Sequence, residues 1–179
     1  VTIFGGVLSH HLVKRSGAKP GDWIAVTGSL GGSLLRHHYD FTPRLNEGVF
    51  LGQQIMPTAM IDISDGLVQD LSHILKASQV GAVLEINEIP VSRDARKMSP
   101  GNSAKALARA LSDGEDFELL FTVSPRQKMM LDKIWAKRFP KVPMTWIGRI
   151  EGVNPLIAWR RNGKKVSPPR LLQKGFSHF

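Results

Sequence analysis

Met60-Ile61-Asp62-Ile63-Ser64-Asp65-Gly66-Leu67 is a stretch in which an apolar strand is expected to run into a helix. The residues before Asp62 are apolar and predict a buried strand, and 67–78 repeats apolar residues at the spacing of one helix face. The junction therefore places two carboxylates and a hydroxyl between a strand and a helix, and this alternation favours an α/β fold.

The residue types at this junction suit a metal ion and a phosphate. An ionised carboxylate next to a buried strand is costly unless a cation or several donors compensate it. Carboxylate oxygens of Asp62 and Asp65 suit Mg²⁺, and the N–H groups of a first helical turn attract phosphate. A structural alternative remains open at this point, in which Ser64 or Asp65 only caps the helix.

Two further segments accompany the junction. Arg15-Ser16-Gly17-Ala18-Lys19-Pro20-Gly21-Asp22-Trp23-Ile24-Ala25-Val26-Thr27-Gly28-Ser29-Leu30-Gly31 precedes it, and Leu111-Ser112-Asp113-Gly114-Glu115-Asp116-Phe117-Glu118-Leu119-Leu120-Phe121-Thr122 follows it. Together the three segments closely resemble the C-terminal half of the thiamine-monophosphate kinases, in the superfamily of aminoimidazole ribonucleotide synthetase, selenophosphate synthetase and a hydrogenase maturation factor. The resemblance covers nearly the whole chain and ends with Gly175-Phe176-Ser177-His178-Phe179.

The resemblance implies an ATP- and Mg²⁺-dependent phosphotransferase that converts thiamine monophosphate to thiamine diphosphate by direct transfer of the γ-phosphoryl group. Phosphoryl transfer needs in-line positioning and cations that neutralise the phosphates, which clustered Asp residues and an Arg can provide. Matched motif positions imply Mg²⁺ ligands at Asp62 and Asp65, ATP contacts at Arg15 and Ser64, and substrate contacts at Glu115 and Phe176, the last chosen over Phe179.

The resemblance also sets an expected domain organisation. Members of the family carry an N-terminal ATP-binding domain with further Asp-rich motifs, so residues 1–16 are expected to be the end of that domain and a linker. Residues 17–179 are expected to form the C-terminal domain, as a mixed β-sheet with helical layers of the α+β type. We expect the fragment alone to be inactive and the full-length protein to be a homodimer. Phe117 stands where the family commonly has Tyr, which removes one hydroxyl.

Composition narrows the class of protein. The 179 residues are 42% hydrophobic and 22% charged, which is typical of a globular domain with one core. No run approaches the roughly 20 apolar residues of a membrane span, so no membrane partner and a cytoplasmic location are expected. The chain has no cysteine, which excludes disulfides and thiolate chemistry.

The formal net charge of +9 favours an anionic partner. The basic residues are scattered, and the cluster at 160–165 brackets an Asn-Gly turn typical of a solvated hairpin tip. Phosphorylated small molecules are therefore preferred to nucleic acid as partners. Two alternatives remain: another ATP-dependent enzyme of the same superfamily, and a non-catalytic anion-binding module.

Several local expectations follow from periodicity and turn chemistry. Helices are expected at 8–16, 67–78, 103–111 and from Pro125 to before Pro140, and strands at 23–27, 82–86, 118–123, 144–150 and 156–161. Asp116 is expected to be structural, holding a loop through backbone N–H groups, because alternation along a strand places it opposite Glu115. Arg44 is expected to be exposed, with a phosphate contact as the alternative.

Overall fold

The computed structural model describes residues 5–35 and 38–169. Its described residues form one mixed sheet with the strand order β2-β4-β1-β5-β3-β6-β7. Neighbouring strands are antiparallel except for the parallel pair β3 and β6. The strands are β1 (Trp23–Thr27), β2 (Ala59–Asp62), β3 (Gly81–Glu85), β4 (Leu119–Val123), β5 (Met144–Glu151), β6 (Ile157–Arg161) and β7 (Lys164–Val166). The expected mixed sheet is confirmed.

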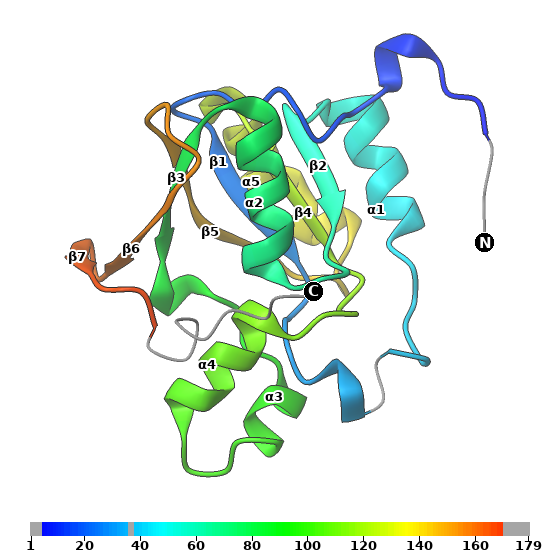
Figure 1. The fold of residues 1–179 in the computed structure, drawn as a ribbon. Coiled ribbons are helices and arrows are strands. Elements are labelled where there is room, and N and C mark those ends of the chain that lie inside the picture. Colours follow the sequence, from blue (N-terminus) through cyan, green and yellow to red (C-terminus); the bar gives the residue numbers. More distant parts are fainter. Residues whose placement is uncertain (1–4, 36–37, 170–179) are drawn as a thin grey trace.

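Helices cover both faces of this sheet (Figure 1). One face packs against α2 and the other against α1, the π-helical turn that follows it, and α5. A smaller unit of α3 and α4 lies beyond one end of the sheet. The helical elements are η1 (Ser9–His11), η2 (Ser33–Leu35), α1 (Leu45–Phe50), η3 (Leu51–Ile55), α2 (Leu67–Ser78), η4 (Ile86–Glu88), α3 (Arg93–Lys97), α4 (Ser103–Ser112) and α5 (Pro125–Arg138).

Alternation along the central strand β1 builds a core on each face. Ile24 and Val26 are fully buried with α2 on one side, and Ala25 is fully buried on the side of α5. Since successive strand residues point to opposite faces, both faces must be covered to keep these side chains from water. The sheet is therefore the middle layer of three.

Most of the expected elements are confirmed, and the exceptions have local causes. The helix expected at 8–16 is only the 3-10 turn Ser9–His11. Glycine was expected to end α2 at Gly81, but the C-cap residue is Gln79, which lies in the left-handed region at φ 57°. The Asn162-Gly163 hairpin is present, with φ of 51° and 74° at these two residues. None of the helices in 5–35 and 38–169 has the length and apolar character that a membrane crossing requires.

Candidate active site

The three motif segments meet where β2 ends and β4 begins. Asp62, the last residue of β2, pairs with Leu119, the first residue of β4. The chain continues this pairing through the loops, because the N–H of Ile63 donates to the carbonyl of Glu118 and the N–H of Phe117 donates back to Ile63, both at 2.8 Å. Two segments that lie far apart in the sequence thus share one hydrogen-bonded ladder.

The next step of this ladder joins the candidate metal and substrate residues. The N–H of Glu115 donates to the carbonyl of Ser64 at 2.8 Å. Gly114 lies so close to the same carbonyl that a Cβ there would be 2.6 Å from it. Glycine at this position therefore permits the contact between the two loops.

The Gly28–Ser33 loop is the third member of the site. The N–H of Gly31 donates to both carboxylate oxygens of Asp116 at 2.9 Å, and the N–H of Gly32 donates to Asp113 at 2.9 Å. The hydroxyl of Ser33 donates to the carbonyl of Gly114 at 2.5 Å. The predicted structural role of Asp116 is confirmed, and this loop is held by carboxylates.

Asp116 is a buried carboxyl with a perturbed titration. Its pKa is raised to about 7, chiefly by burial, and the carboxylates of Asp113 and Glu118 add to this, while the N–H of Gly31 acts in the opposite direction. The carboxyl that holds the Gly28–Ser33 loop therefore changes charge near neutral pH.

The junction between β2 and α2 differs in two respects from its sequence expectation. Asp62 is exposed, so the predicted cost of a buried charge there is wrong, because β2 is an edge strand that is open to water at this end. Neither Ser64 nor Asp65 caps α2, which begins at Leu67 with Gly66 as its N-cap residue. The structural alternative of a cap is therefore wrong as well.

The side chain of Asp70, in the first turn of α2, instead holds the loop that precedes the helix. It is 1% exposed and accepts the N–H groups of both Ser64 and Asp65 at 3.0 Å. Burial raises the pKa of Asp70, and the charges of Asp65 and Asp62 raise it further against the effect of those two N–H groups. Two of the N–H groups expected to attract phosphate are consequently used inside the protein.

The carboxylates at this junction form an oxygen-rich cluster. Asp65, Asp70 and His73 each offer a ligand atom, and these atoms lie within 4.8 Å of one another. Among the described residues, neither Asp62 nor Asp65 forms an ion pair. Carboxylate oxygens are ligands that Mg²⁺ prefers, so Asp65 in this cluster suits the ion, whereas Asp62 is exposed and is not a member of the cluster.

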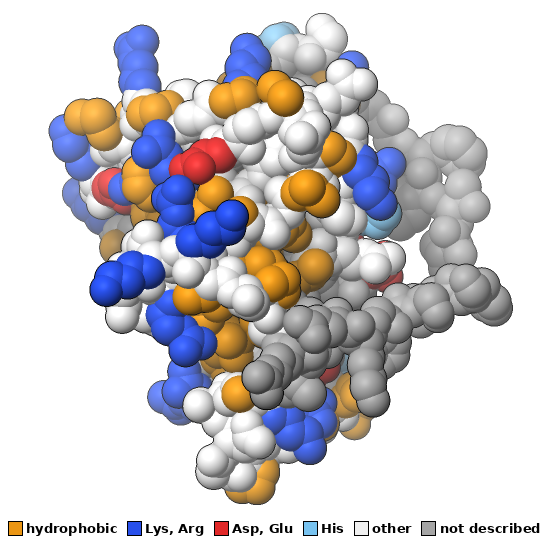
Figure 2. All heavy atoms as spheres, turned by 60° about the vertical axis from the view of Figure 1, so that its left-hand side comes forward, with side chains coloured by type: hydrophobic (Ala, Val, Ile, Leu, Met, Phe, Trp, Pro, Cys, Tyr) orange, Lys and Arg blue, Asp and Glu red, His pale blue; other side chains and the backbone are white. Residues whose placement is uncertain are grey.

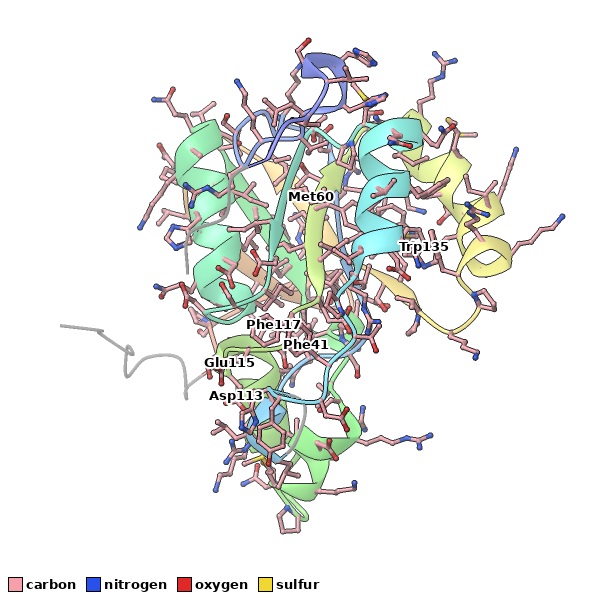
Figure 3. All side chains as sticks on the ribbon, turned by 90° about the vertical axis from the view of Figure 1, so that its right-hand side faces the viewer. Phe41, Met60, Asp113, Glu115, Phe117 and Trp135 are labelled. Carbon is pink, nitrogen blue, oxygen red and sulfur yellow. The ribbon has the colours of Figure 1, made fainter. Side chains whose placement is uncertain are left out.

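Glu115 and Phe117 occupy unusual backbone conformations. Their φ angles are 63° and 50°, in the left-handed region that favours glycine. Glu115 is exposed, and the ring of Phe117 stacks on Phe41 with centroids 4.2 Å apart (Figure 3). Glu115 and Asp116 do point to different environments as expected, but from a loop, because β4 begins only at Leu119.

The remaining predicted site residues are less closely joined to this cluster. Arg15 is exposed and follows Lys14, whose carbonyl accepts the N–H of Met60 in β2 at 3.0 Å. Arg15 forms no ion pair with Asp62 or any other described carboxylate. Phe176, like Phe179, lies outside the described residues.

A buried ion pair beneath the site is one feature that the sequence did not reveal. Arg44 donates to both carboxylate oxygens of Glu118 at 2.7 and 2.6 Å, and Thr27 donates to the same carboxylate at 2.6 Å. The expectation that Arg44 is exposed is wrong, since its side chain is 17% exposed. A Cβ on Gly28 would lie 1.9 Å from Glu118, which explains the glycine at the start of this loop.

Sequence comparison relates this chain to thiamine-monophosphate kinases. No protein-family model matches the chain. The thiamine-monophosphate kinase of Rhodopirellula baltica is 38% identical over 165 residues, covering 92% of this chain and 50% of that protein. The corresponding protein of Escherichia coli K12 is 37% identical over 200 residues, covering 99% and 58%.

Solved structures agree with these relatives. Thiamine-monophosphate kinase from Stenotrophomonas maltophilia superposes with a TM-score of 0.70 at 30% identity, over 86% of this chain and 54% of that one. AaThiL complexed with AMPPCP and TMP superposes with a TM-score of 0.58 at 29% identity, over 87% and 52%. PurL of Thermotoga maritima complexed with ATP, at 14% identity and a TM-score of 0.66 over 93% and 28%, shares the fold. The chain spans about half the length of the curated relatives it matches.

Proposed function

The chain is homologous to about half the length of the thiamine-monophosphate kinases, and we propose that the protein containing it phosphorylates thiamine monophosphate with ATP. The products are thiamine diphosphate and ADP. The observation that carries this proposal is the hydrogen bond from the N–H of Glu115 to the carbonyl of Ser64. It joins the loop of the candidate substrate residue Glu115 to the loop that holds the candidate metal and ATP residues at 62–65. A transfer reaction requires its two reactants to be held within reach of each other.

Direct transfer assigns a task to each candidate residue. Asp62 and Asp65 hold Mg²⁺, which when bound neutralises negative charge on the phosphates. The Ser64 hydroxyl and the Arg15 guanidinium contact the phosphates of ATP. The backbone N–H groups of Ser64 and Asp65 do not serve this purpose, because both already donate to Asp70. A phosphate oxygen of thiamine monophosphate attacks the γ-phosphorus in line, and ADP leaves.

The substrate contacts of this proposal come from Glu115 and Phe176. Glu115 is exposed beside Ser64, and its carboxylate suits the cationic thiamine moiety. A homodimeric state of the full-length protein belongs to the same proposal and rests on the family resemblance, and a cytoplasmic location is proposed with it.

The test is formation of thiamine diphosphate from thiamine monophosphate, ATP and Mg²⁺ by the complete protein that contains this chain. Asp62→Asn is expected to lower turnover by roughly 100-fold or more, as loss of a group that stabilises transition-state charge does. Because Asp62 is exposed, this substitution should change the free energy of unfolding of the protein by less than about 0.5 kcal/mol. Asp94→Asn, which alters a half-buried carboxylate in α3, is the matched control and should leave turnover unchanged.

Three results would contradict the proposal in different ways. Equal losses of turnover and stability in Asp62→Asn would make this carboxylate structural. Turnover with aminoimidazole precursors or selenide, but not with thiamine monophosphate, would identify another enzyme of the superfamily. Binding of anions that depends steeply on salt and is indifferent to Mg²⁺, without turnover, would indicate a non-catalytic module.

A further inference from the structure

A groove of about 1040 Å³ lies between η4, the start of α4 and the β6–β7 hairpin, and its described lining contains none of the candidate site residues. Its volume is that of a small-molecule site. On the molecular face that carries the hairpin, exposed hydrophobic side chains lie among many Lys and Arg side chains (Figure 2). The apolar part of the groove lining is Ile86, Ile89, Val91, Ala104, Ala106, Leu107, Val166 and Pro169.

The N-terminus of α4 opens into this groove. Asn102, the N-cap residue, and Ser103 and Ala104 of the first turn all line it. The side chain of Asn102 accepts the N–H of Lys105, whereas the N–H groups of Ser103 and Ala104 have no intrahelical partner. This end of a ten-residue helix carries partial positive charge, which attracts an anion.

Ser99 provides an independent indication of a ligand. It lines the groove, is only 4% exposed, and its hydroxyl has no hydrogen-bond partner among the described residues. A buried hydroxyl without a partner costs free energy that a ligand oxygen would recover.

The charges of the lining have one sign. Arg96 and Arg161 are exposed and line the groove, and its described lining contains no carboxylate. Within residues 5–35 and 38–169, Arg96 makes only long contacts, of 3.4 Å, with the carbonyl of Val91. Both guanidinium groups are thus available to an anion.

We propose that this groove binds a small molecule that carries a phosphate on an apolar body. The phosphate lies at the N-terminus of α4 between Arg96 and Arg161, and the apolar body covers the hydrophobic lining. The C-terminal segment 170–179 is a poorer occupant by charge, because it brings Arg170 and Lys174 and no acidic side chain. This site is separate from the proposed kinase site and does not depend on it.

The probe for the test is 1-naphthyl phosphate, with 1-naphthol and inorganic phosphate as its two separate halves. Binding is followed by amide chemical shifts of the 179-residue chain, and changes are expected at residues 99–107 and at Arg161. The phosphate ester should bind roughly tenfold or more tightly than 1-naphthol, the factor that charge-assisted hydrogen bonds supply.

Three variants locate the phosphate. The double variant Arg96→Gln, Arg161→Gln should remove the preference for the ester over 1-naphthol. Ser99→Ala should lower the affinity for the ester by roughly threefold to tenfold. Arg160→Gln is the matched control, because Arg160 lies next to Arg161, pairs with Glu151 and does not line the groove. Its affinity for the ester should be unchanged.

Any of the following outcomes would overturn the proposal. Equal binding of 1-naphthol and its phosphate would make the groove merely apolar. If the double variant kept its preference for the ester over 1-naphthol, or if Arg160→Gln lost as much affinity for the ester, general positive charge would explain the binding. Binding that appears only after deletion of residues 170–179 would identify that segment as the occupant.

Discussion

The buried pair of Arg44 and Glu118 allows a quantitative test of how this site is supported. The side chain of Glu118 is 3% exposed and that of Arg44 is 17% exposed, and two hydrogen bonds join them. In Arg44→Ala the carboxylate keeps, among the described residues, only the hydroxyl of Thr27 as a side-chain donor. Removal of one partner from a buried pair costs about 3–5 kcal/mol, since the other charge is left uncompensated.

The assay is urea unfolding followed by tryptophan fluorescence and circular dichroism. With a slope of about 2 kcal/mol/M, the loss expected for Arg44→Ala lowers the midpoint by roughly 1.5–2.5 M. If this variant does not fold, Arg44→Lys keeps the charge without the two-pronged geometry and should lose less.

Lys97→Ala is the matched control, because Lys97 forms an exposed pair with Asp94, with side chains 71% and 35% exposed. An exposed pair contributes less than about 1 kcal/mol. A loss in Arg44→Ala no larger than that in Lys97→Ala would refute the argument that burial makes the pair of Arg44 and Glu118 important.

Three further outcomes are expected from the same structure. Because the pKa of Asp116 is raised to about 7 in the folded state from 3.8, the folded protein binds more protons than the unfolded chain between these values. Stability should therefore fall as pH rises from about 4 to about 7, and urea midpoints of Asp116→Asn should show less of this fall. Gly31→Ala should lower the melting temperature far more than Gly101→Ala: both have positive φ, of 83° and 68°, but a Cβ at Gly31 would lie 2.5 Å from the backbone of α4 and one at Gly101 meets nothing within 4 Å. Ser124→Ala should cost about 1 kcal/mol of unfolding free energy, since it removes a capping box shared with Gln127; an unchanged midpoint would contradict this.

Local sequence patterns predicted much of the fold. The bounds of α2 are those expected, and α5 begins at Pro125 after its cap, because apolar spacing and capping residues act within one or two helical turns. The Asn162-Gly163 hairpin follows from two residues that accept positive φ. The helix expected at 8–16 was wrong, since the observed turn Ser9–His11 has no buried residue that would anchor a longer helix.

Motif order predicted the candidate residues, but their environments depended on distant partners. The structure confirms that Asp116 holds a loop, 85 positions away at Gly31. It contradicts the buried setting expected for Asp62, because exposure there depends on which strand lies at the edge of the sheet. The roles proposed for Arg15, Ser64, Glu115 and Phe176 remain predictions.

The sequence by itself determined the helices α2, α4 and α5, most of the strands, the Asn162-Gly163 turn, and the three motifs that relate this chain to the thiamine-monophosphate kinases. Those features depend on the spacing and type of neighbouring residues. Only the tertiary structure decided that Arg44 meets Glu118 across 74 positions, that Thr27 meets the same carboxylate across 91, and that the carboxyl of Asp116 titrates near pH 7. These properties arise from burial and from contacts between segments that the strand order brings together, and no local pattern encodes either one.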